Sequence, residues 1–302
     1  MRIISSDEID ACLDDRSVLE TLRRAYRSNT VVPRTAPMPL TRLGGLSGAL
    51  SLQPAWTDFA AQGDVSRGYI GCALALDLPE RPGPAASLYV LFSGSTGQPI
   101  ALLDGMRLTV WRTSALHALA ASYLSREDTA RLLVIGDDPR LPRLVSAYAD
   151  VRNLTSILLA GTAPETQKRI AGLPGLKDVH VGVTSEIHAA QEGADLICIA
   201  GPESGSGTHH ALTYLDPPAG CHVDVIDPTA QLPTDLLEEA RLFTSDLSAP
   251  PRSELEWAAD LRELTHGNKA GRRYYGQRTL FLPGPGTGLA DHALAAHIFL
   301  RT

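Results

Sequence analysis

Four stretches of the chain carry hydrophobic residues at the spacing of an amphipathic helix. The first follows Ser5 or Ser6, whose hydroxyls can accept hydrogen bonds from the free amides of a first turn. The second is long and strongly helical in pattern, and we expect it to join two domains. Because chain termini commonly meet, we expect the last to pack back on the first domain. The predicted helices run from Ser5 or Ser6 to Tyr26 and over 107–125, 253–264 and 289–300.

Short alternating runs separate the first two predicted helices. Residues 33–66 hold several prolines and glycines among such runs, which suits strands and loops rather than helices. Residues 69–104 have the pattern of strands interrupted by a Pro/Gly break. The Ser-Gly-Ser-Thr-Gly cluster at 93–97 predicts a hairpin turn between two of them.

The chain changes character after residue 131, where short apolar runs alternate with helical patterns of about ten residues. This alternation is typical of βαβ units around a buried parallel sheet, so we expect an α/β fold with a Rossmann-like domain. The predicted strands lie within 131–138, 155–161, 178–184, 194–201, 221–227, 240–246 and 274–286.

Composition narrows the function classes. The chain has 302 residues, 44% of them hydrophobic, which can bury a large core in two domains or one large α/β unit and excludes a disordered chain. The net charge of −7 gives no field that attracts nucleic acid or an anionic membrane, so we expect neither as a partner. Four widely spaced cysteines suggest neither a zinc site nor a disulfide framework. Acidic residues in the opening segment argue against a signal peptide, no apolar run reaches membrane-span length, and we expect a cytoplasmic protein.

The sequence Leu133 to Arg140 stands where the first strand of a dinucleotide fold turns into its first helix. Glycines there let the backbone approach a pyrophosphate, but this chain keeps Gly136 alone, followed by Asp137, Asp138 and Pro139. The two carboxylates oppose a phosphate, although Arg140 and Arg143 could offset them. The acid expected after the second strand is also missing. A nucleotide site and a Rossmann-like scaffold without a nucleotide both remain open.

Two arginines are candidate ligands for a carboxylate. Arg112 lies within an apolar helical run, where a guanidinium is costly to bury unless it meets an anion. Arg34 lies in a loop made rigid by prolines and could be a second contact. The alternative for each is a solvated surface arginine.

Three further groups of polar residues are candidates for chemistry. Asp224, Asp227 and Thr229 follow or end an apolar strand, where a carboxylate could act as a general base, although Asp-Pro is equally a common turn. A metal cluster is not supported by ligand spacing, and Ser204 lacks the glycine that a nucleophile elbow needs. The residues that such a cluster would use are His209, His210, His222, Asp224 and Asp227.

Several strings together resemble the ornithine cyclodeaminase and μ-crystallin family of NAD(P)-dependent enzymes, over nearly the whole chain. The strings are IISSDEI, Pro33-Arg34, the central run 96–124, ADLICIA at 194–200, LTHGNKAGR at 264–272 and TLFLPGPGTGLAD at 279–291. The resemblance implies a mixed α+β substrate-binding and dimerisation domain formed by both chain ends, residues 1–118 and 278–302. A Rossmann-like dinucleotide-binding domain, residues 119–277, would lie between them, and the protein would be a homodimer.

The resemblance also implies chemistry and roles for particular residues. Family members use NAD or NADP to move hydride at the α-carbon of a small amino or imino acid, by cyclodeamination or by ketimine reduction. Arg112 matches the arginine that holds the substrate carboxylate, Arg34 matches a second one, and Thr113 matches a residue beside the cofactor phosphates. The turn that would bind the cofactor consists of Gly136, Asp137, Asp138, Pro139 and Arg140.

The chain departs from the family pattern at four places. The family lysine expected near 68–70 is absent, and Arg67 is the only nearby cation. The glycine-rich loop is Gly-Asp-Asp-Pro-Arg, and Gly201 stands where a threonine is expected. The catalytic aspartate position falls on Thr229 without a gap and on Asp227 with a short one.

These observations leave three hypotheses. The first is a family enzyme in which Arg112, Arg34 and Arg67 bind substrate and Asp227 is the base. The second is a small-carboxylate-binding protein on the same scaffold without catalysis. The third, a metal-dependent hydrolase, requires a bound zinc ion.

Overall fold

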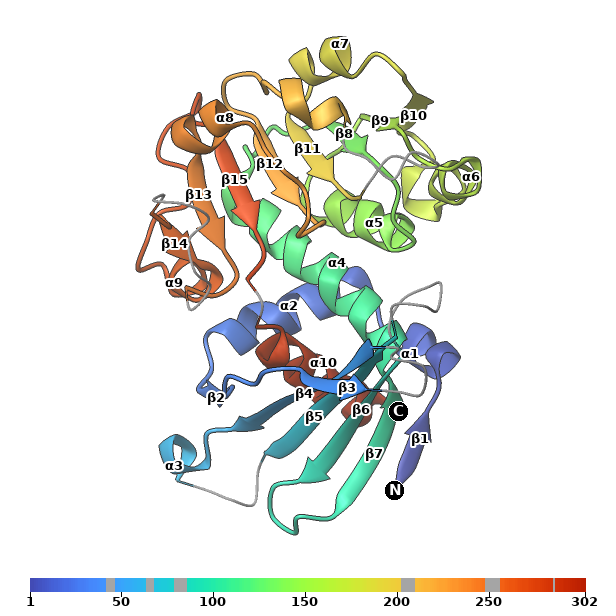
Figure 1. Cartoon of the computed structure of the whole chain (residues 1–302), viewed down its shortest axis with the longest axis vertical. Coiled ribbons are helices and arrows are strands. Elements are labelled where there is room, and N and C mark those ends of the chain that lie inside the picture. Colours follow the sequence, from blue (N-terminus) through green and yellow to red (C-terminus); the bar gives the residue numbers. More distant parts are fainter. Residues whose placement is uncertain (42–46, 64–67, 79–85, 202–209, 248–255, 285) are drawn as a thin grey trace. The chain divides into compact units, whose positions relative to one another are not determined.

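The computed structural model describes residues 1–41, 47–63, 68–78, 86–201, 210–247, 256–284 and 286–302 (Figure 1). The chain divides into two compact units. The first unit consists of Met1–Thr113 and Gly286–Thr302, and the second unit is Ser114–Pro285. Contacts within each unit define these two units, and such contacts do not test a function. The predicted roles of the two domains therefore stay predictions.

A seven-stranded sheet forms the centre of the first unit. Its order is β1-β7-β6-β5-β4-β2, with β3 paired to β4; β1 runs parallel to β7, and the other pairs are antiparallel. The predicted hairpin turn joins β6 to β7, and the Gly97 amide donates to the Ser93 carbonyl over 2.9 Å. The strands are β1 Arg2–Ile4, β2 Thr30–Val31, β3 Met38–Thr41, β4 Ser47–Thr57, β5 Tyr69–Asp77, β6 Ala86–Ser93 and β7 Pro99–Asp104.

The first predicted helix is wrong in one respect, because it is two helices, α1 (Ser6–Cys12) and α2 (Asp15–Tyr26). Leu13 is extended between them, and the Asp14 carboxylate caps α2 by accepting from the Ser17 amide. A residue that caps a new helix cannot also continue the previous helix. Hydrophobic spacing does not reveal such a cap. A short helix, α3 (Phe59–Gln62), lies between β4 and β5.

The last helix, α10 (Gly288–Arg301), packs on α2 and on β4, β5 and β6, as predicted for a terminus that returns to the first part of the chain (Figure 1). The inner face of the sheet is buried there, with Tyr89, Leu91 and Leu103 fully covered. Helix α4 (Gly105–Leu124) begins in the first unit and ends in the second. It confirms the long helix predicted from residue 107.

The second unit has the predicted α/β fold. Its eight strands are all parallel, in the order β10-β9-β8-β11-β12-β15-β13-β14. Alternate residues of β8 and β11 enter separate hydrophobic clusters on the two faces, as in a sheet buried on both sides. The strands are β8 Arg131–Ile135, β9 Ser156–Ala160, β10 His180–Val183, β11 Leu196–Ile199, β12 His222–Val225, β13 Arg241–Thr244, β14 Ala259–Asp260 and β15 Thr279–Leu282.

The helices of the second unit include one whose start was predicted wrongly. The α-helices after α4 are α5 Leu141–Val151, α6 Pro164–Ala171, α7 Ile187–Glu192, α8 Thr234–Glu239 and α9 Leu261–His266, with short 3-10 turns at Pro174–Leu176 and His210–Tyr214. The predicted helix 253–264 begins only at Leu261, because Asp260 and Glu263 form a reciprocal capping box. Residues 253–255 lie outside the described part of the chain.

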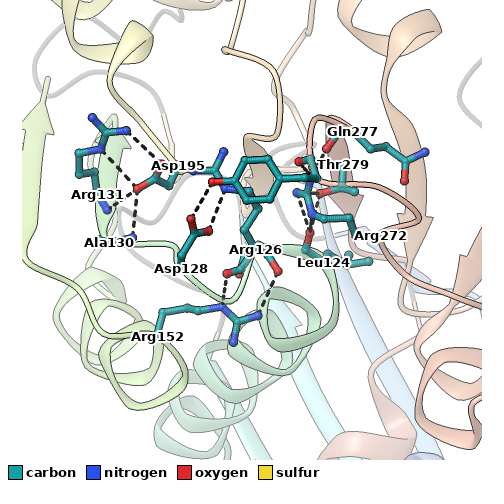
Figure 2. A network of polar contacts seen from close by, with 12 residues as sticks. Leu124, Arg126, Asp128, Ala130, Arg131, Arg152, Asp195, Arg272, Gln277 and Thr279 are labelled. Atoms are coloured by element: carbon teal, nitrogen blue, oxygen red, sulfur yellow. Dashed lines mark hydrogen bonds and ion pairs between the residues drawn. The ribbon is translucent and has the colours of Figure 1, made fainter.

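Two arginines hold the carboxyl end of α4 (Figure 2). Arg152 donates to the carbonyls of Ala121, Ser122, Ser125, Arg126 and Val151. Arg272 donates to the Leu124 carbonyl at 2.9 Å and to the hydroxyl of Thr279 at 3.2 Å. A helix leaves its last carbonyls unpaired and carries partial negative charge at that end, so two cations there stabilise it.

No helix in the described part of the chain is long and apolar enough to cross a membrane.

Candidate functional site

Arg112 is anchored at one of its three guanidinium nitrogens. Its Nε donates to Oδ1 of Asp291 over 3.0 Å, and the side chains are 13% and 5% exposed. Asp291 lies in the first turn of α10, where the helix dipole favours a carboxylate. Among the described residues, no hydrogen-bond acceptor is recorded for Nη1 or Nη2 of Arg112. The ion pair therefore fixes the guanidinium and leaves two parallel donors for a second acid group.

Of the other two predicted substrate arginines, the structure describes one. Arg34 is exposed, in the loop between β2 and β3. The hydroxyl of its neighbour Thr35 donates to the Leu52 carbonyl over 2.6 Å, which ties that loop to β4. Arg67 lies outside the described residues.

Thr113, next to Arg112 on α4, has a buried hydroxyl that lacks a partner in the described part of the chain. The residue is 4% exposed. A buried hydroxyl without a partner costs roughly 1–3 kcal/mol, so such groups are often completed by a ligand or water.

Gly136 follows β8 in a conformation that residues with a side chain rarely adopt, with φ of 91°. A Cβ at this position would lie 1.8 Å from the Gly201 carbonyl oxygen. Its amide donates to the Ala160 carbonyl, and its carbonyl accepts from the hydroxyl of Thr162. The glycine is therefore required by the close approach of the loop after β11.

The carboxylate of Asp138 occupies the turn that follows. Its Oδ1 accepts from the Arg140 amide at 2.7 Å and from Arg140 Nε at 2.8 Å, and its Oδ2 accepts from Arg140 Nη2 at 2.6 Å. The hydrogen bonds from Asp138 raise the pKa of Arg140 above its ordinary value. The Leu141 amide donates to the Asp138 carbonyl, and Pro142 has no amide hydrogen, so the chain itself uses most of the first turn of α5.

The residues of this turn fit a dinucleotide, although the Asp138 carboxylate already accepts from donors that a phosphate would use. The left-handed glycine stands at the carboxyl edge of a parallel sheet, where such ligands bind. Asp137 Oδ1 is buried without a partner in the described part of the chain, as a group that accepts from a ligand hydroxyl would be. Arg140 and its amide would hold a phosphate, but Asp138 already engages both.

Asp227 and Thr229 form one unit just beyond β12. Oδ1 of Asp227 accepts from the amide and from the hydroxyl of Thr229, each at 2.8 Å. Asp227 is 9% exposed. The two positions between which the sequence could not choose are thus in direct contact, with the carboxylate as the acceptor.

Asp224 is instead part of the core. Its Oδ1 lies 2.6 Å from Nδ1 of His117, and its Oδ2 accepts from the hydroxyl of Tyr148 over 2.6 Å. All three residues are at most 1% exposed. Sequence analysis missed His117 and Tyr148; the signal available was a histidine inside the apolar run 107–125.

The histidines and aspartates considered for a metal site do not form one among the described residues. No group of three His, Cys, Asp or Glu there could hold a metal ion. His222 pairs through Nδ1 with the Thr279 hydroxyl at 3.0 Å, and burial lowers its pKa to about 4. Ser204 and His209 lie outside the described residues.

Known proteins resemble the chain in sequence and in fold. A family model described as the ornithine cyclodeaminase/mu-crystallin family matches residues 83–301. A Delta(1)-pyrroline-2-carboxylate reductase of Colwellia psychrerythraea is 27% identical over 256 residues, covering 82% of this chain and 78% of that protein.

Two solved structures share the fold over the whole chain. The Delta(1)-pyrroline-2-carboxylate reductase of Thermococcus litoralis, in complex with NADH and L-proline, has a TM-score of 0.79 at 19% identity and covers 100% of this chain and 97% of its own. An archaeal alanine dehydrogenase dimer with bound NAD has a TM-score of 0.79 at 18% identity and covers 100% and 95%. The predicted fold class is confirmed.

Proposed function

The chain belongs to the ornithine cyclodeaminase/mu-crystallin family, and from this premise we propose that it is an NAD(P)-dependent enzyme that transfers hydride at the α-carbon of a small amino or imino acid. The observation that carries the proposal is Arg112, which is fixed through Nε by Asp291 and keeps two donors for an acid group. Relatives named as reductases of an imino acid support the same class of substrate.

Arg112 binds the substrate carboxylate in this proposal. A planar guanidinium whose Nε is already fixed presents Nη1 and Nη2 to the two oxygens of a carboxylate, which sets the orientation of the α-carbon. Arg34, in a loop of the same unit, supplies further positive charge in this proposal, and we assign the same role to Arg67. Orientation of this kind can supply a large part of a rate enhancement.

Asp227 moves the proton in this proposal. Its carboxylate accepts two hydrogen bonds from Thr229, which hold its orientation. A nicotinamide, when bound, supplies or accepts the hydride. Thr113, with its unpartnered hydroxyl, and Arg140 are the residues that we assign to the cofactor phosphates.

The first substrate to test is Δ1-pyrroline-2-carboxylate with NADH and with NADPH, followed by L-ornithine with NAD⁺. With the imino acid, oxidation of the reduced nicotinamide, followed by absorbance, and formation of proline measure the reaction. With L-ornithine the hydride is returned and NAD⁺ is not consumed, so formation of proline and ammonia measures it. The proposal expects turnover with at least one cyclic imino acid and a loss of at least about a hundredfold in kcat/KM for Arg112→Ala. Turnover of Arg112→Ala at the wild-type rate would contradict it.

We propose that two copies of the chain assemble through the outer face of the sheet of the first unit. A groove of about 530 Å³ there is lined largely by apolar side chains. Leu88 is 48% exposed and Leu76 is 36% exposed on this face, whereas Tyr89 and Leu91 on the opposite face of β6 are buried. A large exposed apolar area is typical of an interaction surface. A solved structure with the same fold is described as a dimer, which supports a dimeric assembly.

We place the enzyme in the cytoplasm. The four cysteines are free, and Cys198 and Cys221 are buried, as expected of thiols in a reducing compartment.

A second candidate function, carboxylate binding without turnover, is favoured by one observation, the ion pair of Asp138 with Arg140 in the cofactor turn. Under this alternative, a panel of amino and keto acids raises the melting temperature and NAD(P)H does not. Asp227→Asn would then leave ligand binding unchanged with no activity to lose.

A further inference from the structure

The turn after β8 offers its donors to a carboxylate of the chain itself. We propose that Asp138 competes with the cofactor's pyrophosphate for Arg140, and that this competition sets the affinity of the chain for NAD(P). The inference rests on the proposed function and concerns its cofactor site.

The contacts of Asp138 resemble those that a bound phosphate makes. One carboxylate oxygen accepts from the Arg140 amide and Nε, at 2.7 and 2.8 Å, and the other accepts from Nη2 at 2.6 Å. Phosphate and carboxylate both match a guanidinium through two oxygens, and a backbone amide at a helix start is a usual phosphate donor. Since each N–H points at one acceptor, a phosphate can take these donors only after Asp138 leaves them.

The position of Asp138 explains why it can compete. In a Gly-x-Gly turn the second glycine gives the pyrophosphate room to reach the backbone. Here Gly136 keeps the first position, and Asp138 fills the second with a side chain of negative charge. Asp138 is 14% exposed and Arg140 is 28% exposed, so solvent does not fully screen the pair.

Charge adds to the competition. The Asp138–Arg140 pair is formally neutral, because the carboxylate balances the charge of the guanidinium. A pyrophosphate is therefore attracted less strongly by Arg140, and it is repelled by Asp138. Removal of the Asp138 charge reverses both effects. At the short distances involved, an effect of at least about tenfold on the dissociation constant is expected.

Asp138→Asn and Asp138→Gly test this inference on the full chain. Asparagine keeps an oxygen for the Arg140 amide and removes the charge, so the turn before α5 keeps that hydrogen bond. Glycine removes both and restores the Gly-x-Gly pattern. Glu238→Gln, at an exposed position on α8, is the matched control for the loss of one negative charge. The probes are NADH, NADPH and ADP-ribose, measured by fluorescence and calorimetric titration.

The inference expects both Asp138 variants to bind NADH or NADPH, and ADP-ribose, at least about tenfold more tightly than the wild type, with Glu238→Gln within about twofold of it. Arg140→Gln should weaken binding, because it removes the donors for which the anions compete. Measurable wild-type binding that neither Asp138 variant improves would overturn the inference and leave the proposed function standing. If no form of the protein bound either cofactor at millimolar concentration, the proposed function would fail, and the inference with it.

Discussion

Nδ1 of His117 lies 2.6 Å from Oδ1 of Asp224 in the core of the second unit, where both side chains are buried. Tyr148 donates to the other carboxylate oxygen, so Asp224 has a partner for each oxygen. Burial and the nearby carboxylate raise the pKa of Tyr148 well above its ordinary value, which keeps the phenol a donor. A buried carboxylate is tolerated only when it is paired in this way.

His117→Leu should lower the free energy of unfolding by roughly 3–5 kcal/mol, because it leaves Asp224 with one partner in a buried site. Tyr148→Phe should cost about 1–3 kcal/mol for the same reason. Denaturation by urea, followed by circular dichroism, measures both changes. Asp224→Leu and the double variant His117→Leu/Asp224→Leu complete a double-mutant cycle, and the double variant should cost less than the sum of His117→Leu and Asp224→Leu. Additive losses would show that the two side chains are not coupled.

The periodicity of hydrophobic residues predicted the helices and strands in which buried positions recur at a regular spacing. Helix α4 and the seven predicted strands of the second unit have apolar patterns, and their existence is confirmed, whereas the two-residue strand β14 (Ala259–Asp260) falls within the predicted helix 253–264 and was not predicted. The break at Leu13–Asp14 and the late start of α9 at Leu261 depend on single capping side chains, Asp14 and Asp260. Hydrophobic spacing does not detect a cap, so these boundaries were missed.

The candidate site was visible where partners are close in sequence. Asp138 and Arg140 are two residues apart, and their opposite charges already suggested compensation. Asp291 lies 179 residues from Arg112, so no local pattern joined them. Asp224 was considered as a base because it lies on an apolar strand, but the packing of α4 and α5 determines that it meets His117 and Tyr148.

Stability should fall as the pH is lowered from about 6.5 toward 4. Burial lowers the pKa of His222 and of His292 to about 4, so the unfolded chain takes up protons that the folded chain does not. The hydroxyl of Thr279 donates to the Leu124 carbonyl, so Nδ1 of His222 is the donor to Thr279. Nε2 of His222 is buried without a partner among the described residues, and a proton there would be a buried charge.

Each of these histidines should contribute a slope of about 1 kcal/mol per pH unit below pH 6.5 to the free energy of unfolding. His292→Gln should flatten the pH dependence of the first unit between pH 6.5 and 5. His266→Gln is the matched control, since that side chain is exposed at the end of α9. An identical pH dependence in wild type and His292→Gln would contradict the prediction.

Arg152→Met and Arg272→Met should each destabilise the second unit by about 2–4 kcal/mol, because charged hydrogen bonds to helix-end carbonyls are lost. Burial lowers the pKa of both arginines, which shows that their protonated forms are desolvated. Arg273→Met is the matched control: Arg273 is exposed next to Arg272 and should change stability by about 0.5 kcal/mol or less. Equal losses in Arg272→Met and Arg273→Met would refute the capping role.

Arg112→Lys should weaken the binding of a carboxylate ligand by about a hundredfold, because an ammonium cannot present two parallel donors while bonded to Asp291. Calorimetric titration with L-proline measures this loss. Arg107→Lys is the control, since Arg107 lies on the same helix and its Nε pairs with Asp10 at 2.5 Å. Asp291→Asn keeps an acceptor for Nε and should cost less than Arg112→Lys. A larger loss in Arg107→Lys would place the ligand elsewhere on α4.

Leu88→Lys should convert the proposed dimer into a monomer. The outer face of the first unit's sheet carries leucines from adjacent strands, including Leu76 and Leu88, and the groove of about 530 Å³ runs across them. A lysine in the middle of that face would lose its hydrating water in a dimer. The free energy needed for this desolvation exceeds the stabilisation from the contacts around it. Sedimentation equilibrium across a concentration series measures the change.

Val183→Lys, on strand β10 of the second unit, is the control. Val183 is 60% exposed, so this variant removes an accessible apolar residue outside the proposed interface and should leave assembly unchanged. A monomeric wild type, or a Leu88→Lys variant that still dimerises, would show that this face is not where the two copies meet.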